Sequence, residues 1–148
     1  MSYFSGEYEC KVDAKGRMVF PSKFKSRLPE SSANEIVVSR GFEKCLVIYP
    51  IVEWKKIYSK VIGLNEFNEE YRNFQRNFFR GNTEIELDTN GRLLLPKRML
   101  LYSNIEKEMV AVGIGNRIEL WNPEIYEEYL VKDQQEFSQL AQKFLSDE

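Results

Sequence analysis

One ten-residue stretch occurs twice in this chain, and the repetition limits what the chain can fold into. Residues 12–21 read VDAKGRMVFP and residues 87–96 read LDTNGRLLLP, with Asp, Gly, Arg and Pro at equivalent places. The two aspartates, Asp13 and Asp88, lie 75 residues apart, and matched residues on both sides share this offset. Self-similarity at a fixed offset indicates a duplicated structural unit.

Beyond the turns the offset shortens to 72 residues, so that Gly41 matches Gly113. A difference in loop length between the two copies explains this change. We therefore predict two repeats, residues 1–75 and residues 76–148. A unit of about 75 residues buries only a small core by itself, so we expect the two repeats to share one core in one compact folded unit.

Each repeat is predicted to contain four short strands and a small helix. Hydrophobic and polar residues alternate over 7–12 and 82–87, which is typical of half-exposed strands. The small helices are expected at 22–28, with Ser22 as the N-cap, and at 96–102. The other strands are expected at 17–21, 36–40 and 45–49 and, in the second repeat, at 92–96, 109–113 and 117–121.

Apolar residues at helical spacing predict longer helices in both repeats. One such stripe covers residues 54–61. In the second repeat, Asn122 followed by Pro123 is a strong helix-start signal. Further stripes cover 67–78 and 137–145, and we interpret them as packing surfaces against the sheet or another subunit.

The turn sequences Asp-Ala-Lys-Gly and Asp-Thr-Asn-Gly suit a type I turn that closes with a left-handed residue. The carboxylates of Asp13 and Asp88 can accept hydrogen bonds from backbone N–H groups of the turn. Gly16 and Gly91 can adopt a positive φ without steric cost. These four residues are predicted to shape the turns. Arg17 can pair with Asp13 or with a carboxylate on a neighbouring strand, and the motif would then be only a well-made hairpin.

Lys15, Arg17, Asn90 and Arg92 are candidate nucleic-acid contacts, because a rigid turn can present them to a DNA groove. Arginine can bond both acceptors on the guanine edge, and lysine can reach the same edge or a phosphate. Asparagine suits adenine or a backbone phosphate. The residues alone leave open whether the turns contact DNA or only complete the fold.

The charge distribution and the composition of the chain bear on the other classes of function. The net charge is −2, yet residues 1–28 carry +3 and residues 119–148 carry −6. Local polyanion binding can coexist with such a balance, and a solvated surface of mixed sign explains it equally. The chain has no histidine, the commonest general base, and it shows no nucleophile elbow or phosphate-binding loop. We expect no enzyme activity, no catalytic residues, no cofactor and no small-molecule substrate.

The two cysteines, Cys10 and Cys45, lie in strand-like runs and are expected to be buried free thiols, so no metal site is predicted. No apolar run approaches the roughly 20 residues that span a bilayer, and no signal-peptide pattern is present. A cytoplasmic protein without membrane contact is therefore expected.

The chain resembles the MraZ family of bacterial transcriptional regulators, which are encoded at the start of the division and cell-wall gene cluster. The resemblance is carried by residues 4–24, 41–54, 78–96 and 112–130, which include both DxxGR turns and the stretch GIGNRIELW. It implies an α+β, mainly β, fold: a pseudo-two-fold swapped-hairpin (double-split) AbrB-like β-barrel built from two tandem repeats, with flanking helices.

The resemblance also implies a function. Members bind G-rich direct repeats in double-stranded DNA upstream of their own operon, usually repress it, and form homo-oligomer rings, commonly octamers or dodecamers. Their DNA contacts carry over to Asp13, Lys15 and Arg17 and to Asp88 and Arg92. We therefore expect a sequence-specific DNA-binding regulator at the nucleoid, with its acidic C-terminal helices facing away from the DNA. The alternative is an antitoxin-like or scaffold barrel that binds protein.

Overall fold

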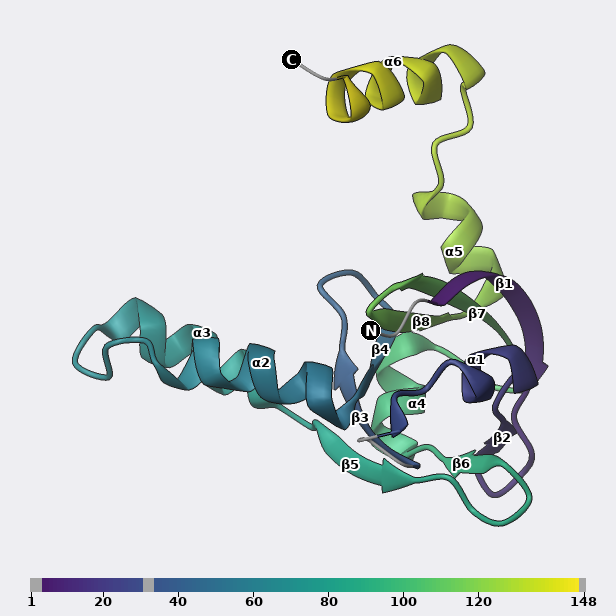
Figure 1. The fold of residues 1–148 in the computed structure, drawn as a ribbon, viewed down its shortest axis with the longest axis horizontal. Helices are drawn as coiled ribbons and strands as arrows, with labels where there is room; N and C mark the ends of the chain where they lie inside the picture. The colour runs from purple at the N-terminus through teal and green to yellow at the C-terminus, as the bar shows by residue number, and fades with distance from the viewer. Residues whose placement is uncertain (1–3, 31–33, 147–148) are drawn as a thin grey trace.

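The computed structural model describes residues 4–30 and 34–146, and it is mainly β with helices around the sheet (Figure 1). Strands and helices follow one another in the same order in both halves of this described part. The first half contains β1 (Phe4–Lys11), β2 (Arg17–Val19), α1 (Ser22–Ser26), β3 (Glu35–Arg40), β4 (Leu46–Pro50), α2 (Ile51–Ile62) and α3 (Glu69–Phe79). The second contains β5 (Thr83–Glu86), β6 (Arg92–Leu94), α4 (Lys97–Ser103), β7 (Glu108–Gly115), β8 (Arg117–Trp121), α5 (Pro123–Tyr129) and α6 (Gln134–Leu145).

Strands from the two halves interleave in one antiparallel sheet of order β1-β7-β8-β4-β3-β5. The first strand of each half pairs with the third strand of the other, β1 with β7 and β5 with β3. The fourth strands, β4 and β8, pair with each other, and so do the second strands, β2 and β6, in a separate sheet. Exchanging the halves therefore reproduces the pairing scheme. The larger sheet is not closed, so its hydrogen bonds do not by themselves make a barrel.

The alternation of side chains explains why β3 is apolar on both faces. Ile36 and Val38 point into the main core, whereas Val37 points to the other face, where it packs with Ile51 and Trp54 at the start of α2. Successive residues of a strand face opposite sides, and both sides are covered here. This is why the sequence shows a continuous apolar run and not an alternating one.

The main core contains matched residues from both halves. Met18 and Phe24 of the first half lie in it with Leu93 and Met99 of the second, and each is at most 1% exposed. Each pair is related by the offset of 75 residues. Neither half encloses this core alone, which agrees with the expectation from repeat length.

Two predictions of helix starts had different outcomes. Asn122 caps α5, because its side chain accepts hydrogen bonds from the backbone N–H of Glu124 at 2.8 Å and of Ile125 at 3.1 Å. The prediction that Ser22 caps α1 is wrong. Ser22 is already the first helical residue, and Pro21 precedes it without a side-chain capping bond.

Both cysteines are free, but only one is fully buried. Cys45 has no exposed surface, and burial raises the pKa of its thiol to about 12. Cys10 is half-buried, because it occupies a β1 position that alternates with exposed residues and is only partly covered. The prediction of a buried thiol therefore holds for Cys45 and is corrected for Cys10.

Two helical arms project from the sheet (Figure 1). Helices α2 and α3 form one arm, in which the ring of Trp54 stacks on Phe78 with centroids 5.7 Å apart. Helix α5 is tied to β1, because the Tyr126 hydroxyl donates a hydrogen bond to the carboxylate of Glu7. Helix α6 follows after a linker and lies apart from the sheet. In the described ranges, no helix has the length and apolar character needed to cross a membrane.

Candidate nucleic-acid interface

The first repeated turn is built around the carboxylate of Asp13. Its Oδ1 accepts hydrogen bonds from the backbone N–H groups of Lys15 and Arg17, both at 2.9 Å. The Gly16 N–H donates to the Asp13 carbonyl at 3.0 Å, and Gly16 has a φ of +88°. The turn is thus closed by a left-handed glycine, as its sequence predicted.

The same carboxylate holds the arginine side chain. Arg17 Nε donates to Asp13 Oδ2 at 2.9 Å, and the arginine side chain remains 32% exposed. Within the described residues, the Nη groups of Arg17 make no hydrogen bond. A guanidinium has N–H donors on all three nitrogens, so the Nη donors remain for an external acceptor. Arg17 can therefore pair with Asp13 and bind an external acceptor at the same time.

The second turn has the same geometry. Asp88 Oδ1 accepts from the backbone N–H of Asn90 at 2.9 Å and of Arg92 at 2.8 Å, and Arg92 Nε donates to Asp88 Oδ2 at 3.0 Å. Gly91 has a φ of +73°. The duplication therefore preserves the hydrogen bonds of the turn as well as its sequence.

Hydrogen bonding stabilises the ionised form of both turn carboxylates. The pKa values of Asp13 and Asp88 lie below the usual 3.8, chiefly because each accepts a hydrogen bond from the backbone N–H of its arginine. Hydrogen bonds to the ionised form favour that form. At neutral pH each turn accordingly offers a fixed anion to its arginine.

The two turns are joined by a short antiparallel ribbon made of β2 and β6. In this ribbon Arg17 is opposite Leu94, and Val19 is opposite Arg92. Alternate residues of a strand share a face, so these four side chains lie on the outer face, and the residue between each pair is buried. Val19 and Leu94 are 63% and 57% exposed. The outer face thus carries two cations on one diagonal of the ribbon and two apolar side chains on the other.

Backbone hydrogen bonds fix the turns to the ribbon. Leu95 N–H donates to the Gly16 carbonyl at 2.8 Å, and Phe20 N–H donates to the Gly91 carbonyl at 3.0 Å. Each turn is therefore bonded to the residue that directly follows the ribbon strand of the other half. The spacing between the turns is consequently set by the ribbon and not by a flexible loop.

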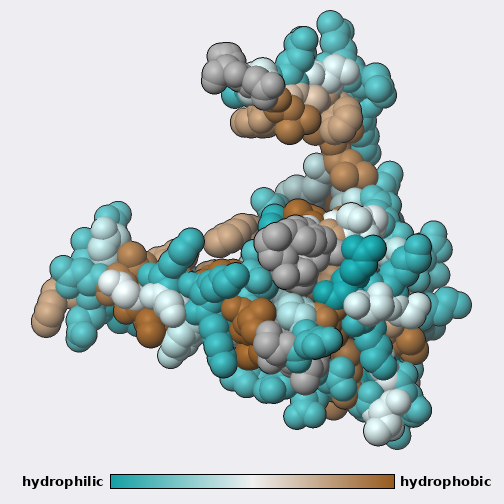
Figure 2. Space-filling view, viewed as in Figure 1, coloured by the Kyte–Doolittle hydropathy of each residue, from teal (hydrophilic) through white to brown (hydrophobic). Residues whose placement is uncertain are grey.

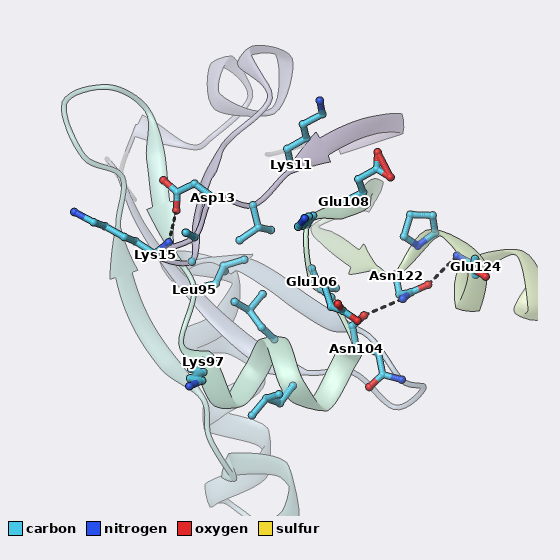
Figure 3. Close-up of a pocket in the computed structure, with 18 residues that line it drawn as sticks. Lys11, Asp13, Lys15, Leu95, Lys97, Asn104, Glu106, Glu108, Asn122 and Glu124 are labelled. Atoms are coloured by element: carbon cyan, nitrogen blue, oxygen red, sulfur yellow. Dashed lines mark hydrogen bonds between the residues drawn. The ribbon is translucent and has the colours of Figure 1, made fainter.

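The remaining predicted contacts, Lys15 and Asn90, occupy equivalent positions at the tips of the turns. Both are exposed, and only their backbone N–H groups are tied to the turn carboxylates. The Lys15 side chain extends away from the neighbouring residues into solvent (Figure 3). All four predicted contact residues are thus brought to one ribbon and its turns.

Val19 and Leu94 were not singled out from the sequence. A signal was available, because each alternates with a buried residue in a strand that begins at the turn arginine. Exposed apolar side chains on a ribbon that also carries arginines are suited to contact with thymine methyl groups.

A groove of about 1230 Å³ lies beside the first turn, between it and the segment from α4 to the start of α5 (Figure 3). Its charged lining residues balance, with four of each sign: Lys11, Lys15, Lys97, Lys107, Asp13, Glu106, Glu108 and Glu124. A balanced groove does not favour a polyanion. The outer face of the ribbon is therefore the better candidate interface. Glu124, at the start of α5, lines the same groove as residues of the first turn. Helix α6 lies on the opposite side of the molecule from both turns (Figure 1).

These features define a class of two-repeat, mainly β protein in which an arginine-bearing turn lies at each end of one two-stranded ribbon. Within the described residues, no cluster of His, Cys, Asp and Glu could hold a metal ion. The family model described as "MraZ protein, putative antitoxin-like" matches residues 3–77 and 78–147. The chain therefore belongs to the MraZ family, as the sequence motifs indicated.

Two curated relatives are similar over nearly their whole length, and both are named transcriptional regulator MraZ. The protein from Cytophaga hutchinsonii is 58% identical over 146 residues, which cover 99% of this chain and 97% of that protein. The protein from Christiangramia forsetii is 39% identical over 144 residues, covering 97% of this chain and 93% of that protein.

Proposed function

We propose that this protein is a sequence-specific transcriptional regulator that binds double-stranded DNA through the β2–β6 ribbon and its two turns. The observation that carries the proposal is the repeated ion pair, in which Asp13 holds Arg17 and Asp88 holds Arg92 in the same geometry. The names of the relatives support a regulatory role. The proposed role needs no catalytic residue, cofactor or small-molecule substrate.

The dimensions of the ribbon suit the major groove, which admits a two-stranded β-ribbon. Arg17 and Arg92 lie two ladder positions apart along the ribbon, roughly 7 Å at the rise of an antiparallel strand. This distance corresponds to about two base-pair steps. Each guanidinium could then bond a guanine edge, which fits a G-rich operator. Lys15 and Asn90 would contact flanking bases or phosphates.

We further propose the AbrB-like swapped-hairpin barrel as the full description of the fold, with repeats at 1–75 and 76–148. Three features support it: the pairing of β1 with β7, the pairing of β5 with β3, and the bridge between Val12 and Met18 that connects β1 to β2. In this barrel the turns lie at one end.

A homo-oligomer ring, an octamer or dodecamer, is part of the proposal. Hydrophobic atoms are visible along α6 and among hydrophilic ones on the α2–α3 arm (Figure 2). Phe67 on the α2–α3 arm is 86% exposed, and Phe137 and Phe144 on α6 are 59% and 69% exposed. Apolar stripes of this kind are surfaces for association. A ring would engage consecutive direct repeats together and gain avidity, at the nucleoid in the cytoplasm.

A second candidate is a protein-binding barrel. The groove beside the first turn favours it, because Leu101 at its edge is 67% exposed among balanced charges. The description of the family also contains the words antitoxin-like. A peptide could use this groove without any contact to the ribbon.

Footprinting on the DNA upstream of the protein's own gene separates the two candidates. A DNA-binding regulator that represses its own division and cell-wall operon should protect several short G-rich repeats at regular spacing. Protection should disappear when Arg17 and Arg92 are both replaced by alanine. A footprint that is absent with the unaltered protein, at concentrations where it is folded, would contradict DNA binding and favour the protein-binding barrel.

A further inference from the structure

The two turns differ in charge although their hydrogen bonds are the same. The first turn contains Asp13, Lys15 and Arg17 and carries a net charge of +1. The second contains Asp88, Asn90 and Arg92 and is neutral. A neutral turn gains little from the field of a phosphate backbone, so the second turn by itself should bind DNA less well.

A lysine from another element lies beside the neutral turn. The Lys25 Nζ, on α1, is 3.9 Å from the point that a Cβ of Gly91 would occupy. At the first turn the equivalent neighbour is Leu100 of α4, whose Cδ1 is 3.6 Å from the corresponding point at Gly16. Lys25 and Leu100 are related by the same offset of 75 residues as the turns. The two repeats therefore differ at this position: Lys25 lies beside the second turn, whereas Leu100 lies beside the first.

The surroundings of Lys25 leave its ammonium group available. Lys25 is exposed, and in the described part of the chain its Nζ takes part in no ion pair or hydrogen bond. Its backbone is nevertheless fixed, because its N–H donates to the Pro21 carbonyl at 3.0 Å and the adjacent Phe24 is 1% exposed in the core. The helix thus holds a free cation next to Gly91.

We propose that Lys25 completes a composite phosphate-binding site at the second turn, together with Asn90 and Arg92, and that its ligand is a DNA backbone phosphodiester. This inference rests on the proposed DNA-binding function. Lys25 restores to the second turn the net charge of +1 that Lys15 gives to the first. It is a phosphate contact and not a base contact, because it stands on α1 beside the ribbon. A lysine ammonium is a compact point charge that suits phosphate without reading sequence.

The test is a fluorescence-anisotropy titration of the full-length protein over a range of salt concentrations, with operator DNA and with unrelated DNA. Lys25→Ala should weaken binding to both DNAs by the same factor. It should also lower the slope of log K against log salt by about one for each engaged subunit. Lys55→Ala, an exposed lysine on the projecting α2, is the matched control and should change neither quantity.

A second substitution tests the compensation directly. Asn90→Lys places a lysine at the tip of the second turn, as Lys15 is placed in the first, and in the Lys25→Ala background it should restore affinity and slope. Unchanged binding by Lys25→Ala, or a loss that Asn90→Lys does not restore, would overturn the composite site and leave the proposed function intact. Failure of the unaltered protein to bind either DNA would overturn the proposed function itself, and the composite site with it.

Discussion

Each turn aspartate fixes two things at once, the backbone of the turn and the direction of an arginine. Asp13 Oδ1 bonds the backbone while Oδ2 bonds Arg17 Nε. An arginine that is already held loses less side-chain entropy when it binds a ligand. The spacing of four residues between Asp and Arg therefore has two effects. It suits the geometry of the turn, and it lets the aspartate hold the arginine side chain in place before a ligand binds.

Replacing the carboxylate by an amide should reduce specificity more than affinity. In Asp13→Asn the amide oxygen can still accept the backbone bonds, but it no longer pairs with Arg17. Loss of the negative charge raises attraction to any DNA, whereas the released arginine reads base edges less well. The ratio of affinities for operator and unrelated DNA, measured by anisotropy, should fall. Glu86→Gln removes a charge from an exposed position of β5 that lies outside the turn, and an equal fall in that variant would argue against preorganisation.

The lowered pKa values predict how the turns respond to acid. A group whose folded pKa is depressed contributes stability above its unfolded pKa, and loses it as pH falls through the folded pKa. The pairs should therefore be intact above the ordinary value of 3.8 and break only below it. Carboxyl chemical shifts of Asp13 and Asp88, followed by NMR in a pH titration, should give midpoints below 3.8. Midpoints at or above that value would show that the hydrogen bonds are absent in solution.

The inner face of the β2–β6 ribbon packs in the core, whereas its outer face carries the proposed DNA contacts. Leu93 is fully buried, while its neighbour Leu94 is 57% exposed on the outer face. The strand is only three residues long, so a single inward side chain anchors it. The ribbon should accordingly tolerate changes on one face and not on the other.

Leu93→Ala should lower the free energy of unfolding by about 2–5 kcal/mol, because it leaves a cavity in the shared core. Leu94→Ala should change it by no more than about 0.5 kcal/mol, while weakening DNA binding. Chemical denaturation measures the first quantity and anisotropy the second. Similar destabilisation by both variants would mean that the inner face of the ribbon does not pack in the core as described.

Strand positions could be predicted from the sequence, but strand partners could not. The alternation in residues 7–12 predicts β1, because neighbouring residues alone show the alternating pattern of a strand. Its partner β7 lies about a hundred residues away, where Gly6 is opposite Gly113. A Cβ at Gly113 would lie 2.5 Å from the Ser5 backbone nitrogen, a close approach that no local pattern indicates. The hydrogen bonds inside each turn were predictable for the same reason as β1. The position of Lys25 beside the second turn was not, because α1 reaches that turn only in the folded chain.

At the scale of the molecule, the arms extend away from the ribbon (Figure 1), so the proposed assembly and the proposed DNA contact would use different surfaces. An isolated helix of 12 residues such as α6 is marginal in water without a partner. Its exposed aromatic residues make it a candidate surface for the proposed assembly. The arms and the turns can then be altered independently.

Phe137→Asp combined with Phe144→Asp should therefore reduce self-association and leave the turns unchanged. Sedimentation velocity should show smaller particles, and affinity for DNA with several repeats should fall to that for a single repeat as avidity is lost. Gln142→Asp, an exposed polar position on the same helix, controls for added charge. Particles of unchanged size in the double variant would show that α6 is not part of the assembly surface.

The central claim is that both turns contact DNA, and an anisotropy titration with arginine variants tests it most directly. Arg17→Ala and Arg92→Ala should each cost about 1–3 kcal/mol of binding free energy and relax specificity. The double variant should approach non-specific binding, and all three should unfold at nearly the wild-type temperature, because the ion pairs are exposed. A double variant that binds operator DNA with wild-type affinity and salt dependence would contradict the account.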